Sequence, residues 1–138
     1  NFDLVTPNER EARFSIGDQD STVGALAGEV QRQTNCKNLI LKLGDRGSFS
    51  ISRSSDNNNS YFSIDSFAEN VVDPVGAGDA LLAFASATLY KTKSLPIASI
   101  IGSIAAACEC NIDGNTPIKL SEIIKKIDKI EQLLNYNG

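Results

Sequence analysis

Short apolar runs alternate with segments of helical periodicity along most of this chain, and this alternation limits the folds available to it more than any other feature. Residues 38–43 are mostly apolar and are followed by Gly44, as expected for a buried strand. In residues 120–134, apolar side chains recur instead at every third or fourth position, which is typical of an amphipathic helix. Strands that alternate with helices favour an α/β sandwich with a largely parallel sheet.

The same patterns predict the other elements and place the whole chain, residues 1–138, in one domain. A polar loop is expected at residues 54–60, and residues 38–43 and 48–52 are expected to form a hairpin. We expect the last helix to cover the sheet, with a partner-binding or membrane-surface helix as the alternative. Further strands are expected at residues 2–5, 61–64 and 69–72, and further helices at residues 9–16, from Val23 onward, at 79–90, and from Leu95 onward with Pro96 in the first turn.

Composition excludes several classes of function. The net charge is −4 and no basic stripe is present, so nucleic acid is not expected as a partner; nor is a membrane, because no run of about eighteen apolar residues occurs. The chain has no His, which excludes Ser-His-Asp and Cys-His catalysis within it and leaves a carboxylate, Lys, Tyr or Cys as the general base. Its cysteines, Cys36, Cys108 and Cys110, are expected to be buried thiols in a reducing compartment, the cytoplasm.

A loop of small residues, Gly76, Ala77 and Gly78, lies between an extended run and an apolar helix. Small residues let a ligand approach the backbone closely, and the first N–H groups of the helix together with its dipole attract anions. Asp79, at the start of the helix, has two interpretations: an ordinary helix-start residue, or a carboxylate that takes a proton beside a bound phosphate. The loop is not a Walker sequence, nor is it a dinucleotide fingerprint, which would need Gly at Leu81.

The run from Asp73 to Ala80, DPVGAGDA, resembles the C-terminal signature of the PfkB, or ribokinase-like, family of carbohydrate kinases, although Pro74 replaces the usual Thr. Three other segments match family motifs in the family's order, so that the resemblance covers nearly the whole chain and corresponds to the C-terminal half of the domain. Within the family, the run is most similar to the heptose-phosphate kinase (ADP-heptose synthase-like) branch, whose members are often fused to a nucleotidyltransferase. The three segments are residues 6–11 (TPNERE), residues 41–47 (LKLGDRG), and residues 105–107 (AAA) followed by 113–115 (DGN).

This resemblance implies a three-layer α/β/α sandwich, ATP and Mg²⁺ as cofactors, and phosphorylation of a hydroxyl on a sugar or sugar phosphate. Asp79 matches the catalytic base, and Gly76, Ala77 and Gly78 match the anion hole. Asn8 and Glu11 match the pair that organises Mg²⁺, partly through water; without the resemblance, helix capping would explain both.

The resemblance also implies nucleotide contacts and a second cation. Lys42 stands where Thr is frequent, so its side chain either reaches a phosphate or extends along the surface. Asp73 matches a ligand of a monovalent cation, K⁺, together with backbone carbonyls of Val75, Glu109 and Gly114; turn capping before Pro74 is the alternative. A homodimer is one expected state of the full-length protein. The nucleotide-binding residues implied are Asn8, Lys42, Gly44, Gly47, Ser103 and Asn115.

The sequence is also compatible with other functions. The departures at Pro74 and Lys42 favour a catalytically silent nucleotide-binding module, and the apolar stripe of residues 120–134 favours a scaffold domain. A kinase of the same family acting on a nucleoside or a vitamin precursor is a third alternative. Because the family's substrate-binding residues lie mainly in the first half of the domain, we expect these 138 residues alone to bind nucleotide poorly and to be inactive.

Overall fold

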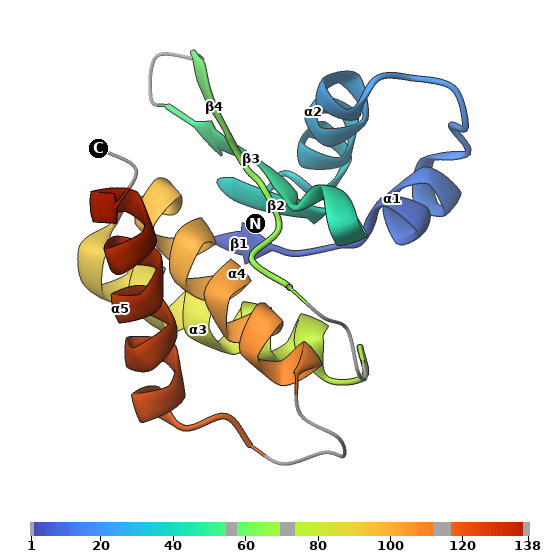
Figure 1. Ribbon diagram of the computed structural model, residues 1–138. Helices are drawn as coiled ribbons and strands as arrows, with labels where there is room; N and C mark the ends of the chain where they lie inside the picture. The colour runs from blue at the N-terminus through green and yellow to red at the C-terminus, as the bar shows by residue number, and fades with distance from the viewer. Residues whose placement is uncertain (1, 55–57, 70–73, 112–116, 137–138) are drawn as a thin grey trace.

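The computed structural model describes residues 2–54, 58–69, 74–111 and 117–136, and Figure 1 shows how its elements are arranged. Within these residues the strands are β1 (Leu4–Val5), β2 (Asn38–Lys42), β3 (Ser48–Arg53) and β4 (Asn59–Ile64). The helices are α1 (Glu9–Ile16), α2 (Val23–Thr34), α3 (Ala77–Thr92), α4 (Leu95–Cys110) and α5 (Leu120–Tyr136), and a 3₁₀ turn, η1 (Gly44–Arg46), joins β2 to β3.

The strands form one sheet in the order β1-β2-β3-β4. β1 and β2 are parallel because α1 and α2 lie between them in the sequence, whereas β2 pairs antiparallel with β3, and β3 with β4. The predicted hairpin is therefore confirmed, but the described sheet is mixed rather than largely parallel. The reason is the length of the connections, since a parallel pair needs a crossover of a dozen or more residues and a short turn allows only an antiparallel pair.

The predicted helices are present, and polar side chains explain where α1, α2 and α4 begin. Asn8, Thr22 and Ser94 each accept a hydrogen bond from a backbone N–H in the first turn of α1, α2 and α4. The predicted loop at 54–60 is shorter than expected, because Asn59 and Ser60 pair with Arg53 and Ser52 as the start of β4. The strand predicted at residues 69–72 lies mostly outside the described residues.

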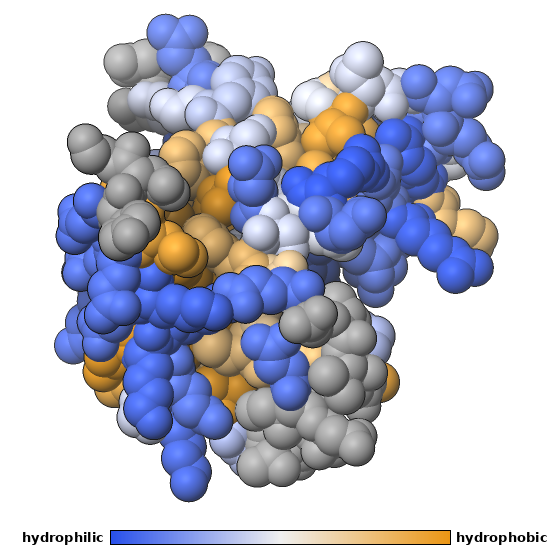
Figure 2. All heavy atoms as spheres, in the orientation of Figure 1, coloured by the Kyte–Doolittle hydropathy of each residue, from blue (hydrophilic) through white to orange (hydrophobic). Residues whose placement is uncertain are grey.

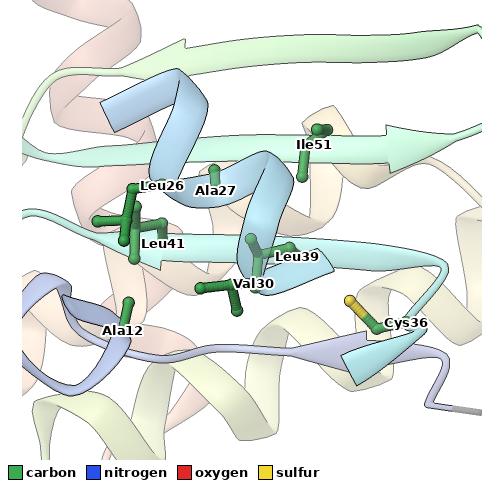
Figure 3. Packing of buried hydrophobic residues seen from close by; sticks show 8 residues of the cluster. All are labelled: Ala12, Leu26, Ala27, Val30, Cys36, Leu39, Leu41 and Ile51. Carbon is green, nitrogen blue, oxygen red and sulfur yellow. The ribbon is translucent and has the colours of Figure 1, made fainter. Parts of the chain in front are cut away.

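Helices cover both faces of the sheet, which confirms the three-layer α/β/α sandwich. Leu39 and Leu41 of β2 pack against α1 and α2 on one face, and Figure 3 shows this cluster with α2 lying over β2 and β3. Ile40, which points the opposite way, packs against α3 and α4 on the other face. The predicted cysteine thiols are buried and lie outside any disulfide. The first cluster consists of Ala12, Leu26, Ala27, Val30, Cys36, Leu39, Leu41 and Ile51.

The prediction that α5 covers the sheet is wrong: α5 packs on α4, because α3 and α4 already occupy that face. Ile123 is buried against α4, together with Ile104 and Cys108. The two ends of the stripe stay exposed, with relative exposures of 65% at Leu120 and 69% at Leu134. The apolar stripe of α5 is thus divided between intramolecular packing and the surface. Within the described residues, no helix has the length and apolar character needed to span a membrane.

Gly47, between η1 and β3, is required by close contact between two backbone segments. Its φ is 84°, and a Cβ at this position would lie 1.9 Å from the carbonyl oxygen of Ile64 and 2.8 Å from the backbone nitrogen of Ser66. Only glycine therefore lets the chain after β4 pass directly against the turn.

We expect Gly47→Ala to lower the free energy of unfolding by about 2–4 kcal/mol, because alanine disfavours the positive φ at this position and its Cβ forces the two backbone segments apart. Urea denaturation monitored by circular dichroism measures this change. Gly28→Ala is the matched control: apart from neighbouring residues of α2 itself, no atom lies within 4 Å of the added Cβ, so stability should rise by up to about 1 kcal/mol. Equal stability of the two variants would contradict the role given to Gly47.

Candidate active site

A cavity of about 640 Å³ lies where the carboxyl end of β2, the turn η1, the N-terminus of α3 and the middle of α4 meet. Figure 2 shows the molecule in the orientation of Figure 1, with hydrophobic residues exposed at the centre of this face and hydrophilic residues on both sides of them. The cavity collects seven of the residues singled out from the sequence: Asn8, Lys42, Gly44, Gly47, Ala77, Gly78 and Ser103.

The sheet explains why segments distant in sequence meet here. The N–H of Lys42 donates to the carbonyl oxygen of Pro7 at 2.9 Å, and this bridge extends the parallel pairing of β1 and β2 as far as Asn8. The chain after β1 and the chain after β2 therefore leave the sheet at the same edge. In α/β proteins, ligands bind in the crevice outside the carboxyl ends of the strands.

Positive charge faces the cavity where Lys42 meets the start of α3. A Cβ on Gly78 would lie 2.9 Å from the Lys42 ammonium nitrogen, so the ammonium lies directly against the loop. The N–H of Ala80 is bonded to the carbonyl oxygen of Gly76 at 2.9 Å, and that of Ala77 to the carbonyl oxygen of Pro74 at 3.3 Å. The N–H groups of Gly78 and Asp79, between them, are among those that a helix leaves without intrahelical acceptors. Lys42 forms no ion pair with any residue that the structure describes. An ammonium and a helix N-terminus together favour an anion.

The opposite wall of the cavity is apolar. Phe67 and Ala68, in the segment after β4, line it together with Leu81 of α3 and Ala106 and Ala107 of α4. On the β3 side, the Ser103 hydroxyl lies 3.4 Å from that of Ser48. The cavity thus has an anion-attracting end and an apolar slot. Sequence analysis missed Phe67, because the segment 65–69 has no periodicity to indicate its position.

Asp79 does not line this cavity. Its exposed side chain borders a second hollow of about 320 Å³, together with Gly76, Ala80 and Phe84. The loop from Gly76 to Gly78 therefore has Lys42 on one side and Asp79 on the other.

Glu109 of α4 also borders the second hollow, and its side chain was not predicted as part of the site. It is only 6% exposed, and its Oε1 would lie 2.9 Å from a Cβ on Gly76. No residue within the described part of the chain pairs with its carboxylate. The sequence signal that could have found it is a single acidic residue between Cys108 and Cys110, in an otherwise uncharged helix. A buried carboxylate without a partner among the described residues fits a bound cation, because burying an unpaired charge is costly.

Asn8 and Glu11 form a reciprocal capping box at the start of α1. The Glu11 N–H donates to Asn8 Oδ1 at 2.7 Å, and the Asn8 N–H donates to Glu11 Oε2 at 2.8 Å. Asn8 lines the large cavity, whereas Glu11 is exposed and does not line it. Their oxygen atoms suit Mg²⁺, and their role with the metal stays a prediction. Asp73 and Asn115, like Gly114, lie outside the described residues.

A charged network fixes the turn η1 against α1. Glu9 accepts hydrogen bonds from Arg13, at 3.0 Å to Nε and 2.8 Å to Nη2, and forms an ion pair with Arg46 of the turn. Hydrogen bonding to Arg13, followed by the positive charge of Arg46, lowers the pKa of Glu9 below its ordinary value of 4.5. Glu9 therefore stabilises the fold above its unfolded-state pKa, and this contribution is lost as the pH falls through the folded-state pKa.

We expect the Glu9 carboxyl to titrate below pH 4.5 in a pH series of NMR spectra. Arg13→Gln should raise this pKa more than Arg46→Gln does, since the hydrogen bonds from Arg13 lower it most. A larger rise of the Glu9 pKa in Arg46→Gln than in Arg13→Gln would show that Arg46, and not Arg13, lowers this pKa most.

The chain is similar in sequence to a known protein family. A sequence model described as pfkB family carbohydrate kinase matches residues 1–118. Protein MAK32 of Saccharomyces cerevisiae is 38% identical to the chain over 150 residues, an alignment that covers 98% of this chain and 41% of that protein.

Two solved structures show the same arrangement of elements. The ribokinase of Thermotoga maritima is 26% identical, with a TM-score of 0.75 over 91% of this chain and 42% of the ribokinase. Phosphofructokinase-2 of Escherichia coli, solved in complex with potassium, has a TM-score of 0.81 at 19% identity, over 95% of this chain and 42% of that chain. The chain therefore spans about two fifths of the length of these relatives.

Proposed function

The chain belongs to the pfkB family of carbohydrate kinases, and we propose that it carries the nucleotide-binding and phosphoryl-transfer part of an ATP-dependent kinase for a sugar or sugar phosphate. One observation supports this most: the large cavity has Lys42 and the α3 N-terminus at one end and the apolar slot at Phe67 at the other. This distribution suits a ligand with a flat apolar base and a chain of phosphates.

In this proposal, the base lies against Phe67 and Ala106 while the phosphates extend toward Lys42 and Gly78. Asp79, on the far side of the loop, accepts the proton of the attacking hydroxyl. The N–H of Gly78 holds the negative charge that develops on the transferred group. The N–H of Ala77 donates to the carbonyl oxygen of Pro74 at 3.3 Å and must leave it to take part. Nucleotide and acceptor thus approach the loop from opposite sides, as an in-line transfer requires.

Two cations belong to the proposal. Mg²⁺ would be held by Asn8 and Glu11, partly through water, and would neutralise phosphate charge. Capping uses Oδ1 of Asn8 and Oε2 of Glu11, so part of this donor set is engaged in the helix cap. K⁺ would be held by Asp73 with the carbonyls of Val75, Glu109 and Gly114, and the buried Glu109 carboxylate adds negative charge beside the loop.

The phosphate acceptor, the cellular location and the oligomeric state are also proposed, on the family relationship rather than on the geometry of the cavity. We propose that the acceptor-binding part of the domain lies outside residues 1–138, and that a heptose phosphate is one candidate acceptor. A nucleoside or vitamin precursor is the alternative acceptor. The Thr-to-Pro change at Pro74 keeps a catalytically silent nucleotide-binding module as the second candidate function. Cytoplasmic location and a homodimer also stay predictions.

Replacement of Asp79 tests the catalytic assignment. In the intact protein, we expect Asp79→Asn to lower kcat about 10²-fold or more, the scale of a lost general base, while ADP affinity stays roughly unchanged. Steady-state kinetics and isothermal titration calorimetry measure the two quantities. Nearly full activity of Asp79→Asn would show that another group takes the proton, and an inactive wild type would favour the silent module.

Replacement of Lys42 tests the anion-attracting end of the cavity. We expect Lys42→Thr to weaken ADP binding about tenfold, the scale of one lost charge-assisted hydrogen bond, and to leave adenosine binding unchanged. Calorimetric titration with both ligands measures the difference. Lys37→Thr, which removes an exposed ion pair with Asp3, is the matched control. An equal loss for ADP and adenosine would place Lys42 away from the phosphates.

A further inference from the structure

The apolar wall of the large cavity is formed in part by a segment without regular secondary structure. Ser66, Phe67 and Ala68 line the cavity, and only Asp65 separates them from β4. A wall of this kind has no helix or strand to hold it, so its position depends on contacts with neighbouring elements.

Three contacts hold the segment. At its start, the backbone at Ser66 lies against Gly47. In its middle, Phe67 packs into the cluster that α4 and α5 form around Ile104 and Ile123. At its end, Glu69 reaches α5.

The contact at Glu69 is electrostatic and comes from two lysines one helical turn apart. Lys126 Nζ donates to Glu69 Oε1 at 3.2 Å, and Lys129 Nζ donates to Oε1 at 3.0 Å and to Oε2 at 2.9 Å. The Lys126 side chain is only 11% exposed, so one side of this network is shielded from water. Hydrogen bonds from Lys129 and then Lys126 lower the pKa of Glu69, which keeps its carboxylate charged.

We infer that Glu69 is a positioning residue for the nucleotide cavity: paired with Lys126 and Lys129, it fixes the wall at 66–68 so that α5 controls nucleotide affinity without touching the ligand. The inference rests on the proposed function. In this inference α5 supports the cavity wall through its lysines, in addition to packing its apolar stripe on α4. The lysines of α5, which its periodicity assigns to a solvated face, become part of the support of the site.

The test uses Glu69→Gln and Lys129→Gln in the intact protein, with two readouts. Hydrogen exchange of the peptide covering residues 65–69, in unliganded protein, should rise about fivefold in Glu69→Gln, the scale of a lost ion pair. The rise should be smaller in Lys129→Gln, which keeps the pair between Lys126 and Glu69. The Kd for ADP should rise by a similar factor. Because Glu69→Gln already removes the contact that Lys129→Gln removes, the double variant should be little worse than Glu69→Gln alone.

Glu29→Gln is the matched control, since it removes an ion pair with Arg32 on α2, whose residues do not line the cavity. It should change neither readout, and urea denaturation should show equal global stability for Glu29→Gln and Glu69→Gln.

Three results would overturn the inference: unchanged exchange at 65–69 in Glu69→Gln, faster exchange with unchanged ADP affinity, or equal effects of Glu29→Gln. If wild type binds no ADP, the proposed function fails first and the inference fails with it.

Discussion

The burial of β2 on both faces is the constraint on which the rest of the structure depends. Leu39 and Leu41 require α1 and α2 on one side, and Ile40 requires α3 and α4 on the other. Once both layers are in place, the carboxyl end of β2 points at the start of α3. Lys42 therefore reaches Gly78 as a consequence of the strand's alternation, and the cavity forms where the three layers meet.

Missing side chains shape the site as much as present ones do. Gly76 leaves room for the Glu109 carboxylate, Gly78 for the Lys42 ammonium, and Gly102 for Leu81 and Ala85 of α3. Opposite charges thus lie on the two sides of one short loop. The loop can hold an anion on the lysine side, while the acidic side with Asp79 repels that anion and suits a proton-transfer or cation-binding role.

Local signals in the sequence predicted local structure well. The apolar periodicity from Val23 onward and Pro96 in a first turn predicted helices, and the patterns of residues 38–43 and 48–52 predicted the hairpin. Packing between distant elements was not predictable in the same way: the stripe of α5 shows that the helix is amphipathic, but not which surface it covers. The positions of Phe67 and Glu109 depend on such packing, so periodicity alone could not assign them to the site.

The large cavity also has an order of assembly. Its lining begins at Asn8 and ends at Cys110, and the segment that closes one wall is held by lysines near the end of the chain. Contacts of such high sequence separation form late, because a long loop must close before they stabilise anything. During synthesis from the N-terminus, the cavity therefore reaches its final form only after α5 has emerged and packed on α4.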